Sequence, residues 1–151
     1  MRKSILYTLF GLGKIPKKIR PALESEGIVA ADEGMRGWFI AKKVKGPGKR
    51  FVHRAAGFSG SLVITQKRII GFTYGKKQIN IDFDNPNITK LFVNIPKEKT
   101  FSIAFEASDF RDDWSGIIEF RFKTDKARQF FDHVQSKGAQ HGTPSDIPRQ
   151  R

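Results

Sequence analysis

Six basic residues surround the turn-forming sequence Gly46-Pro47-Gly48, and they are the strongest candidates for chemistry in this chain. They are Lys42, Lys43, Lys45, Lys49, Arg50 and Arg54. Several cations on one turn can hold a phosphate-bearing headgroup, so the chemistry they suggest is anion binding rather than bond-making. Lysines that flank a strand edge also discourage aggregation, and the sequence leaves both interpretations open.

Acidic residues gather in one place, at Glu106, Asp109, Asp112 and Asp113. A calcium site needs several converging oxygens and usually a glycine-defined loop, and this spacing matches no standard loop. We therefore expect a solvated loop between two strands. Its aromatic residues, Phe110 and Trp114, are expected to insert into the core rather than to form an exposed binding tip.

Motifs for catalysis or cofactor binding do not occur in the sequence. The three histidines, His53, His133 and His141, are far apart, and no pair has metal-ligand spacing. No glycine-rich loop opens a helix to hold phosphate, and residues 57–61 (GFSGS) precede a strand rather than form a nucleophile elbow. The absence of cysteine excludes thiolate nucleophiles, disulfides and cysteine-ligated zinc. We predict that the protein is not an enzyme and that it uses no cofactor or metal.

Charge is concentrated in the N-terminal part of the chain. The protein has 151 residues and a net charge of +13, and residues 1–54 carry 13 Lys/Arg against 4 Asp/Glu. Such asymmetry suggests an anionic partner, either a membrane surface or a nucleic acid. The alternative is a solvated basic surface that only aids solubility.

Residues 1–27 are predicted to form a helical arm. Five apolar residues near its start fall at helical spacing: Ile5, Leu6, Leu9, Phe10 and Leu12. Pro16 and Pro21 interrupt the pattern, so we expect a second short helix from Pro21 to Ser25 that ends at Gly27. The apolar face could enter lipid with Lys17 and Lys18 on headgroups, or it could pack on the barrel or on another subunit.

The apolar stretch at residues 5–12 is far shorter than the ~20 residues of a transmembrane helix, and no small-residue cleavage site follows it. We therefore expect a soluble, cytoplasmic protein that can also lie peripherally at a membrane.

Alternating apolar and polar residues predict a series of short strands over residues 28–123. A first hairpin turns at Gly46-Pro47-Gly48, with Trp38 and Ile40 on one side of its first strand. Further strands are expected at residues 61–65, 68–73, 79–83, 91–95, 101–105 and 118–122. Regular spacing of six or seven short strands favours a barrel or sandwich over an α/β fold.

One amphipathic helix follows the last predicted strand. Its apolar residues are Ala127, Phe130, Phe131 and Val134, with Thr124 as the expected N-cap and Gly138 as the stop. A single helix after the strands can close one end of an open barrel. Residues 138–151 contain prolines and glycines with little apolar content, and we expect them to form a flexible tail.

Two segments resemble a known family. Residues 60–72 (GSLVITQKRIIGF) are similar to the hairpin "G-x-L-x-[IVL]-T-x-x-R-[IVL]-[IVL]" of GRAM and bacterial pleckstrin-homology domains. Residues 118–134, a strand leading into an "A-x-x-F-F-x-x-[IVL]" helix, resemble their C-terminal closure. The resemblance covers residues 28–137. It implies an all-β, pleckstrin-homology-like antiparallel barrel of about seven strands with a C-terminal helix, in which Thr65 and Arg68 have structural roles.

These observations together predict a non-enzymatic binding or adaptor module. Its expected partner is an anionic lipid surface or a protein or peptide, engaged through the basic N-terminal half. Nucleic-acid binding requires aromatic and basic residues interleaved on an exposed sheet face, whereas most phenylalanines here fall at core positions. A self-associating structural module, a homo-oligomer, is the third alternative.

Overall fold

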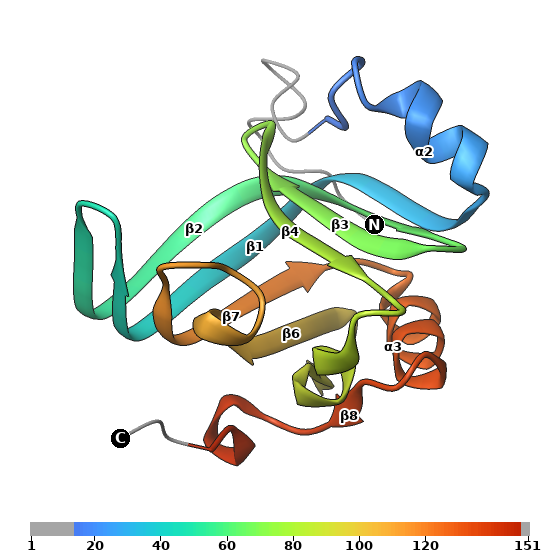
Figure 1. Ribbon diagram of the computed structural model, residues 1–151. Helices are drawn as coiled ribbons and strands as arrows, with labels where there is room; N and C mark the ends of the chain where they lie inside the picture. Colours follow the sequence, from blue (N-terminus) through green and yellow to red (C-terminus); the bar gives the residue numbers. More distant parts are fainter. Residues whose placement is uncertain (1–13, 149–151) are drawn as a thin grey trace.

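The computed structural model describes residues 14–148, and its main element is one curled sheet of eight strands in the order β4-β3-β2-β1-β7-β6-β5-β8 (Figure 1). The strands are β1 (Ile28–Gly46), β2 (Lys49–Thr65), β3 (Arg68–Thr73), β4 (Lys76–Asp82), β5 (Phe92–Lys97), β6 (Thr100–Glu106), β7 (Ser115–Lys123) and β8 (Gln140–His141). The helices are α2 (Arg20–Glu26) and α3 (Ala127–Ser136), with 3-10 turns η1 (Pro86–Lys90), η2 (Ala107–Asp109) and η3 (Pro144–Asp146).

A mostly β fold with a C-terminal helix and a short N-terminal helix is confirmed. The sheet differs in two respects from the predicted antiparallel barrel. It forms a curled half-barrel, and it mixes antiparallel with parallel pairing. Seven strands pair antiparallel, and β8 adds a two-residue parallel pairing to β5.

The two longest strands, β1 and β2, form the expected first hairpin. β1 has 19 residues and β2 has 17, and they remain paired up to Gly46 opposite Lys49. Gly48 has a φ of 69°, which the second central residue of a tight Pro-Gly turn requires. β1 also pairs with β7 from Gly37 to Lys45, so it joins the two halves of the sheet.

The interior of the half-barrel is filled by the alternating apolar residues that the sequence indicated. On β6, β7 and α3 these are Phe101, Ile103, Phe105, Ile118, Phe120, Phe122, Phe130 and Val134, all at most 1% exposed. The Phe101 and Phe130 ring centroids lie 5.8 Å apart, which fixes α3 against β6. Burial of each such side chain contributes roughly 1.5–3 kcal/mol, so these positions dominate the stability of the fold.

Both ends of the described chain cover the outer face of the sheet. Ile15 and Leu23, from the segment before β1, are buried against Val63, Ile70 and Phe72. The predicted short helix is confirmed as α2, and Gly27 ends it with a φ of 83°. The apolar helix expected near residues 5–12 lies outside the described residues.

Residues 138–148, predicted to belong to a flexible tail, are held against the sheet. The Gln140 amide donates to the Leu91 carbonyl at 2.8 Å, and the Gly142 amide donates to the Val93 carbonyl at 3.0 Å. Ile147 is 5% exposed and packs with Phe92. One apolar anchor and a few backbone hydrogen bonds therefore order a segment whose composition suggested a flexible chain.

The closing helix α3 is confirmed with one local difference. Its N-terminal residue is Ala127, and Thr124 lies before the helix with its hydroxyl accepting from the Lys126 amide at 3.1 Å. The same hydroxyl donates to Asp32 Oδ2 at 2.7 Å, which ties this turn to β1. Gly138 follows the helix with a φ of 120°, as its stop role predicted.

Candidate functional site

The basic hairpin, residues 42–54, is the part of β1 and β2 that lies around the turn and extends to one side of the molecule in Figure 1. All six of its predicted cations, Lys42, Lys43, Lys45, Lys49, Arg50 and Arg54, are exposed. Lys45 lies directly opposite Arg50 in the strand register. Like charges opposite one another destabilise a sheet, so the folded structure gains nothing from this arrangement.

No cation of the basic hairpin forms an ion pair with a carboxylate within residues 14–148. The Arg54 guanidinium carbon lies 5.0 Å from the centroid of the Phe51 ring. Val52, which lies between Phe51 and Arg54 in the sequence, is 77% exposed, more than any other large apolar residue within residues 14–148. As far as the described chain shows, the hairpin thus presents positive charge without carboxylate partners around an exposed apolar side chain.

The loop after β6 supports the base of this hairpin. A Cβ atom on Gly46 would lie 2.4 Å from the Trp114 ring, so the ring packs directly on the hairpin backbone. A Cβ atom on Gly116, which has a φ of 102°, would lie 2.4 Å from the Lys43 carbonyl oxygen. The Glu106 carboxylate accepts from the Gly116 amide at 2.8 Å and from the Ser108 amide at 2.7 Å. This loop therefore holds the hairpin in a defined position.

The acidic cluster is divided among separate contacts. Glu106 is 5% exposed and organises its own loop, whereas Asp109 lies 3.6 Å from the Lys90 ammonium. Among residues 14–148 no group of three His, Cys, Asp or Glu side chains could hold a metal ion. Phe110 and Trp114 pack partly buried against the core, which confirms their expected insertion.

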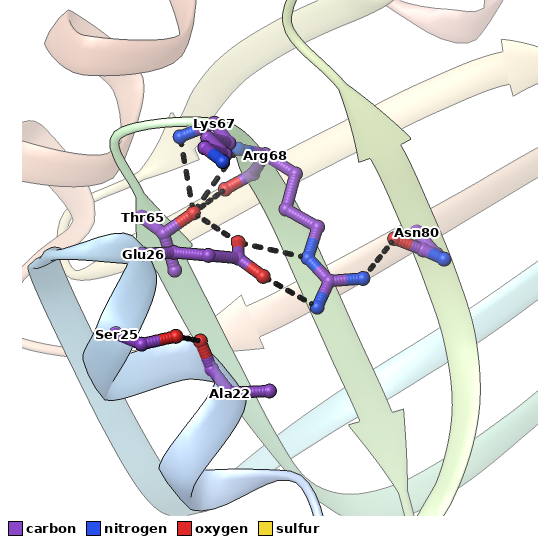
Figure 2. A network of polar contacts seen from close by, with 7 residues as sticks. All are labelled: Ala22, Ser25, Glu26, Thr65, Lys67, Arg68 and Asn80. Atoms are coloured by element: carbon purple, nitrogen blue, oxygen red, sulfur yellow. Dashed lines mark hydrogen bonds and ion pairs between the residues drawn. The ribbon is translucent and has the colours of Figure 1, made fainter.

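Thr65 and Arg68 have the structural roles predicted for them (Figure 2). The Thr65 hydroxyl accepts from the amides of Lys67 and Arg68 at 3.1 Å and donates to Glu26 Oε1 at 2.9 Å. The Arg68 guanidinium donates to both Glu26 oxygens, at 3.0 and 2.8 Å, and to Asn80 Oδ1 at 3.1 Å. We call these four residues, Glu26, Thr65, Arg68 and Asn80, the paired corner.

Two opposing effects act on the carboxyl group of Glu26. Its burial raises the pKa, while hydrogen bonds from Arg68 and Thr65 and the charges of Arg68 and Lys67 lower it. The lowering effects prevail, and the pKa of Glu26 lies below its ordinary value. The ionised form is therefore the one that joins α2 to the β2–β3 turn.

Lys17 and Lys18, expected near the candidate contact surface of the arm, are exposed in the turn before α2. α2 precedes β1, and the basic hairpin lies at the other end of this 19-residue strand. The structure thus does not bring these two sets of predicted residues together. The other predicted arm residues, Ile5, Leu6, Leu9, Phe10 and Leu12, lie outside the described residues.

The histidines lie on three separate elements, β2, α3 and β8. His133 on α3 has its ring 5.7 Å from that of Phe83, and burial together with nearby Lys137 lowers its pKa. His141 Nε2 lies 3.3 Å from Asn94 Oδ1. The exposed His53 faces a hollow that the sequence did not indicate.

This hollow, of about 350 Å³, lies on the outer face of the sheet where β1, β2 and β7 meet the C-terminal segment. Its charged lining residues are Lys42, His53, Glu119 and Arg121. Glu119 is 4% exposed and accepts from the Ser102 hydroxyl at 2.6 Å. Sequence reasoning missed this site because its residues come from four segments and share no motif. The alternation did place Trp38 and Ile40 on one side of β1, and in the structure this is the outer side.

A second hollow of about 300 Å³ lies between β4 and the loop after β6. Arg111 lines it and donates to the Gln78 carbonyl, and burial lowers the pKa of this guanidinium from its ordinary value. Its charge is used within the fold, so this hollow offers less for a ligand than the outer face.

In comparisons with known proteins, the chain matches no protein-family model and no curated protein sequence. None of the helices within residues 14–148 has both the length and the apolar character needed to cross a membrane.

Proposed function

We propose that the protein is a pleckstrin-homology-like, non-enzymatic binding module that engages an anionic membrane surface through the basic hairpin. Two features support the fold part of this proposal. β1 joins a β4-β3-β2 side to a β7-β6-β5 side of the curled sheet, and α3 packs against β5 and β6. The β2–β3 hairpin and the segment from β7 to α3 also contain the two sequence segments on which the family resemblance rests.

The observation that carries the functional part is a cluster of six exposed cations that have no carboxylate partner among residues 14–148 and lie around the exposed Val52. Each cation near an anionic leaflet contributes roughly 1 kcal/mol, and an apolar side chain that enters the interface adds to this. The hairpin thus has the charge and the shape to attach the protein reversibly to a bilayer.

Protection of a strand edge accounts for only part of this charge. Among the strands of residues 14–148, residues 49–57 of β2 pair with β1 alone and form an edge, because β3 pairs only from Gly60 onwards. In contrast, β1 is paired on both sides at Lys42 and Lys45, where it meets β7 as well as β2. Lysines on a strand that is paired on both sides do not protect a strand edge. Binding of an anionic ligand accounts for their presence.

The test is co-sedimentation of the full chain with vesicles of phosphatidylcholine alone or of phosphatidylcholine with phosphatidylserine. We expect recovery with the anionic vesicles only, and its loss when Lys42, Lys43, Lys45, Lys49 and Arg50 are all changed to Glu. Circular dichroism of this variant checks that it folds. Equal recovery with both vesicle types at low salt would overturn the proposal.

A further inference from the structure

Two aromatic residues lie exposed on the outer face of the sheet, separated by a glycine. Trp38 on β1 is 56% exposed, and its register partner on β2 is Gly57. Tyr74, 46% exposed, reaches back over β2 so that its hydroxyl donates to the Gly57 carbonyl at 3.3 Å. We call these three residues the aromatic platform.

No atom of residues 14–148 fills the space above Gly57. A Cβ atom there would meet a single neighbouring atom of this part of the chain, the Gly37 carbonyl oxygen, at 3.8 Å, which is an ordinary contact. The φ of Gly57 is not positive, so its backbone is not in the left-handed region that favours glycine. Neither packing nor backbone geometry therefore requires glycine at this position. Its absent side chain leaves an open gap between the two rings.

Cations border the aromatic platform along the same face. Arg36 and Trp38 alternate with the inward-facing residues of β1, and Arg121 is the register partner of Trp38 on β7. Arg121 Nε lies 3.1 Å from Glu119 Oε2, while its two terminal nitrogens make no hydrogen bond within the described chain. Glu119 thus positions the guanidinium and leaves its outer nitrogens available to a ligand.

This row of cations is longer than one small ligand. It begins at Arg36 and ends at Lys42, which faces the outer hollow together with His53 and Arg121. Arg36 and Lys42 are six positions apart on an extended strand, a distance of about 20 Å. Along β1 the exposed ring of Trp38 lies between Arg36 and Lys42, and cations on either side of a flat ring match a strand of bases and phosphates.

We propose that the aromatic platform and the cations beside it bind single-stranded nucleic acid. Bases stack on Trp38 and Tyr74, since every base has a π-face and stacking on exposed aromatics tolerates any sequence. The terminal nitrogens of Arg121, with Arg36 and Lys42, contact the phosphates. A double helix keeps its bases inside the stack, so it cannot use the platform in this way.

The experiment measures fluorescence anisotropy of labelled oligothymidylates of 3, 6 and 12 nucleotides with the full chain at low salt. We expect affinity to rise with length and to fall with salt, by a log–log slope of about −0.7 for each phosphate contacted. Free thymidine monophosphate is expected to compete poorly. A mononucleotide that binds as tightly as the hexamer would overturn the strand form of the proposal.

Three variants test the platform itself. Trp38→Ala is expected to weaken hexamer binding about tenfold or more, and Trp38→Phe to retain most of it, because a ring remains. Gly57→Val removes no wild-type group but fills the gap, and it is expected to weaken binding to a similar extent. Wild-type circular dichroism spectra establish that the variants fold.

Three results would overturn the inference: no oligonucleotide binding at low salt, equal affinity for duplex and single strand, or unchanged affinity in both Trp38→Ala and Gly57→Val. These outcomes can be distinguished from failure of the proposed membrane function. Lys42 belongs to both proposed sites, but the platform variants leave every residue of the basic hairpin in place, and we expect them to keep vesicle binding.

Discussion

The paired corner and the basic hairpin use the same kinds of side chain in opposite ways. At the paired corner Arg68 and Glu26 are 18% and 16% exposed, and hydrogen bonds join the Arg68 guanidinium to both oxygens of the Glu26 carboxylate (Figure 2). At the basic hairpin six cations are exposed, and none has a carboxylate partner within residues 14–148. The contrast separates charges that build the fold from charges that remain available to a ligand.

The comparison predicts that changes in the two regions affect different measurements. Removing a hairpin charge leaves no buried group without a partner, and it relieves repulsion between Lys45 and Arg50. Removing Arg68 leaves a largely buried carboxylate without its main donor. The first change should therefore alter binding and the second stability.

The largest expected effect is on membrane affinity. Changing Lys42, Lys43, Lys45, Lys49 and Arg50 to Gln removes roughly 1 kcal/mol of attraction for each charge, a loss of about a thousandfold or more. Vesicle titration measures this loss, and urea unfolding should show a midpoint equal to or slightly above that of the wild type. A lowered midpoint would mean that the hairpin charges stabilise the fold.

The next effect is on stability at the paired corner. Arg68→Ala should lower the free energy of unfolding by about 1–3 kcal/mol, because Glu26 and Asn80 lose their donor. Arg68→Lys should recover only part of this, since an ammonium group cannot match the two-oxygen contact. Urea denaturation measures both variants. The idea of two separate roles fails if Arg68→Ala lowers vesicle affinity while the protein remains folded.

The acid side of the stability profile tests the same corner. Because the folded-state pKa of Glu26 is lowered, its contribution is fully present above the unfolded-state pKa of about 4.3 and is lost as pH falls through the folded-state value. Glu26→Gln should reduce stability at neutral pH and flatten this acid decline. Urea midpoints between pH 3 and pH 7 measure the difference. An unchanged decline would assign it to other carboxylates.

The smallest effect concerns the apolar residue of the basic hairpin. Val52→Ala should lower vesicle affinity about fivefold, or about 1 kcal/mol, if the side chain enters the interface. Stability should change by less than about 0.5 kcal/mol, because Val52 is 77% exposed. Titration with anionic vesicles and a parallel urea curve measure both. Unchanged affinity would restrict the contact to charge alone.

Local sequence patterns predicted the structural features that depend on residues close together in the sequence. The β2–β3 turn at Gln66 and Lys67, the apolar face of α3 and the cations around Gly46 all follow from spacing within a few residues. These features formed where they were expected because periodicity and turn chemistry act over short distances.

Features that depend on distant contacts could not be predicted in this way. Glu26 meets Arg68 across 42 residues, and no pattern in either segment identifies the other. Ile147 is buried only because the sheet presents Phe92 at that place, so its composition suggested a tail. The alternation placed most phenylalanines in the core, whereas the exposed rings within residues 14–148 are those of Trp38 and Tyr74. Their proximity depends on the register of three strands.

The most direct test of the hairpin's role is a charge-matched comparison of two triple variants by titration with phosphatidylserine-containing vesicles. One variant changes Lys45, Lys49 and Arg50 to Glu. The other changes to Glu the residues Lys76, Lys77 and Lys97, which are also exposed but lie on β4 and β5. Both lose the same net charge. We predict that the first loses vesicle binding and that the second keeps most of it. Equal weakening of both variants would show that binding follows net charge, and would contradict a specific role for the basic hairpin.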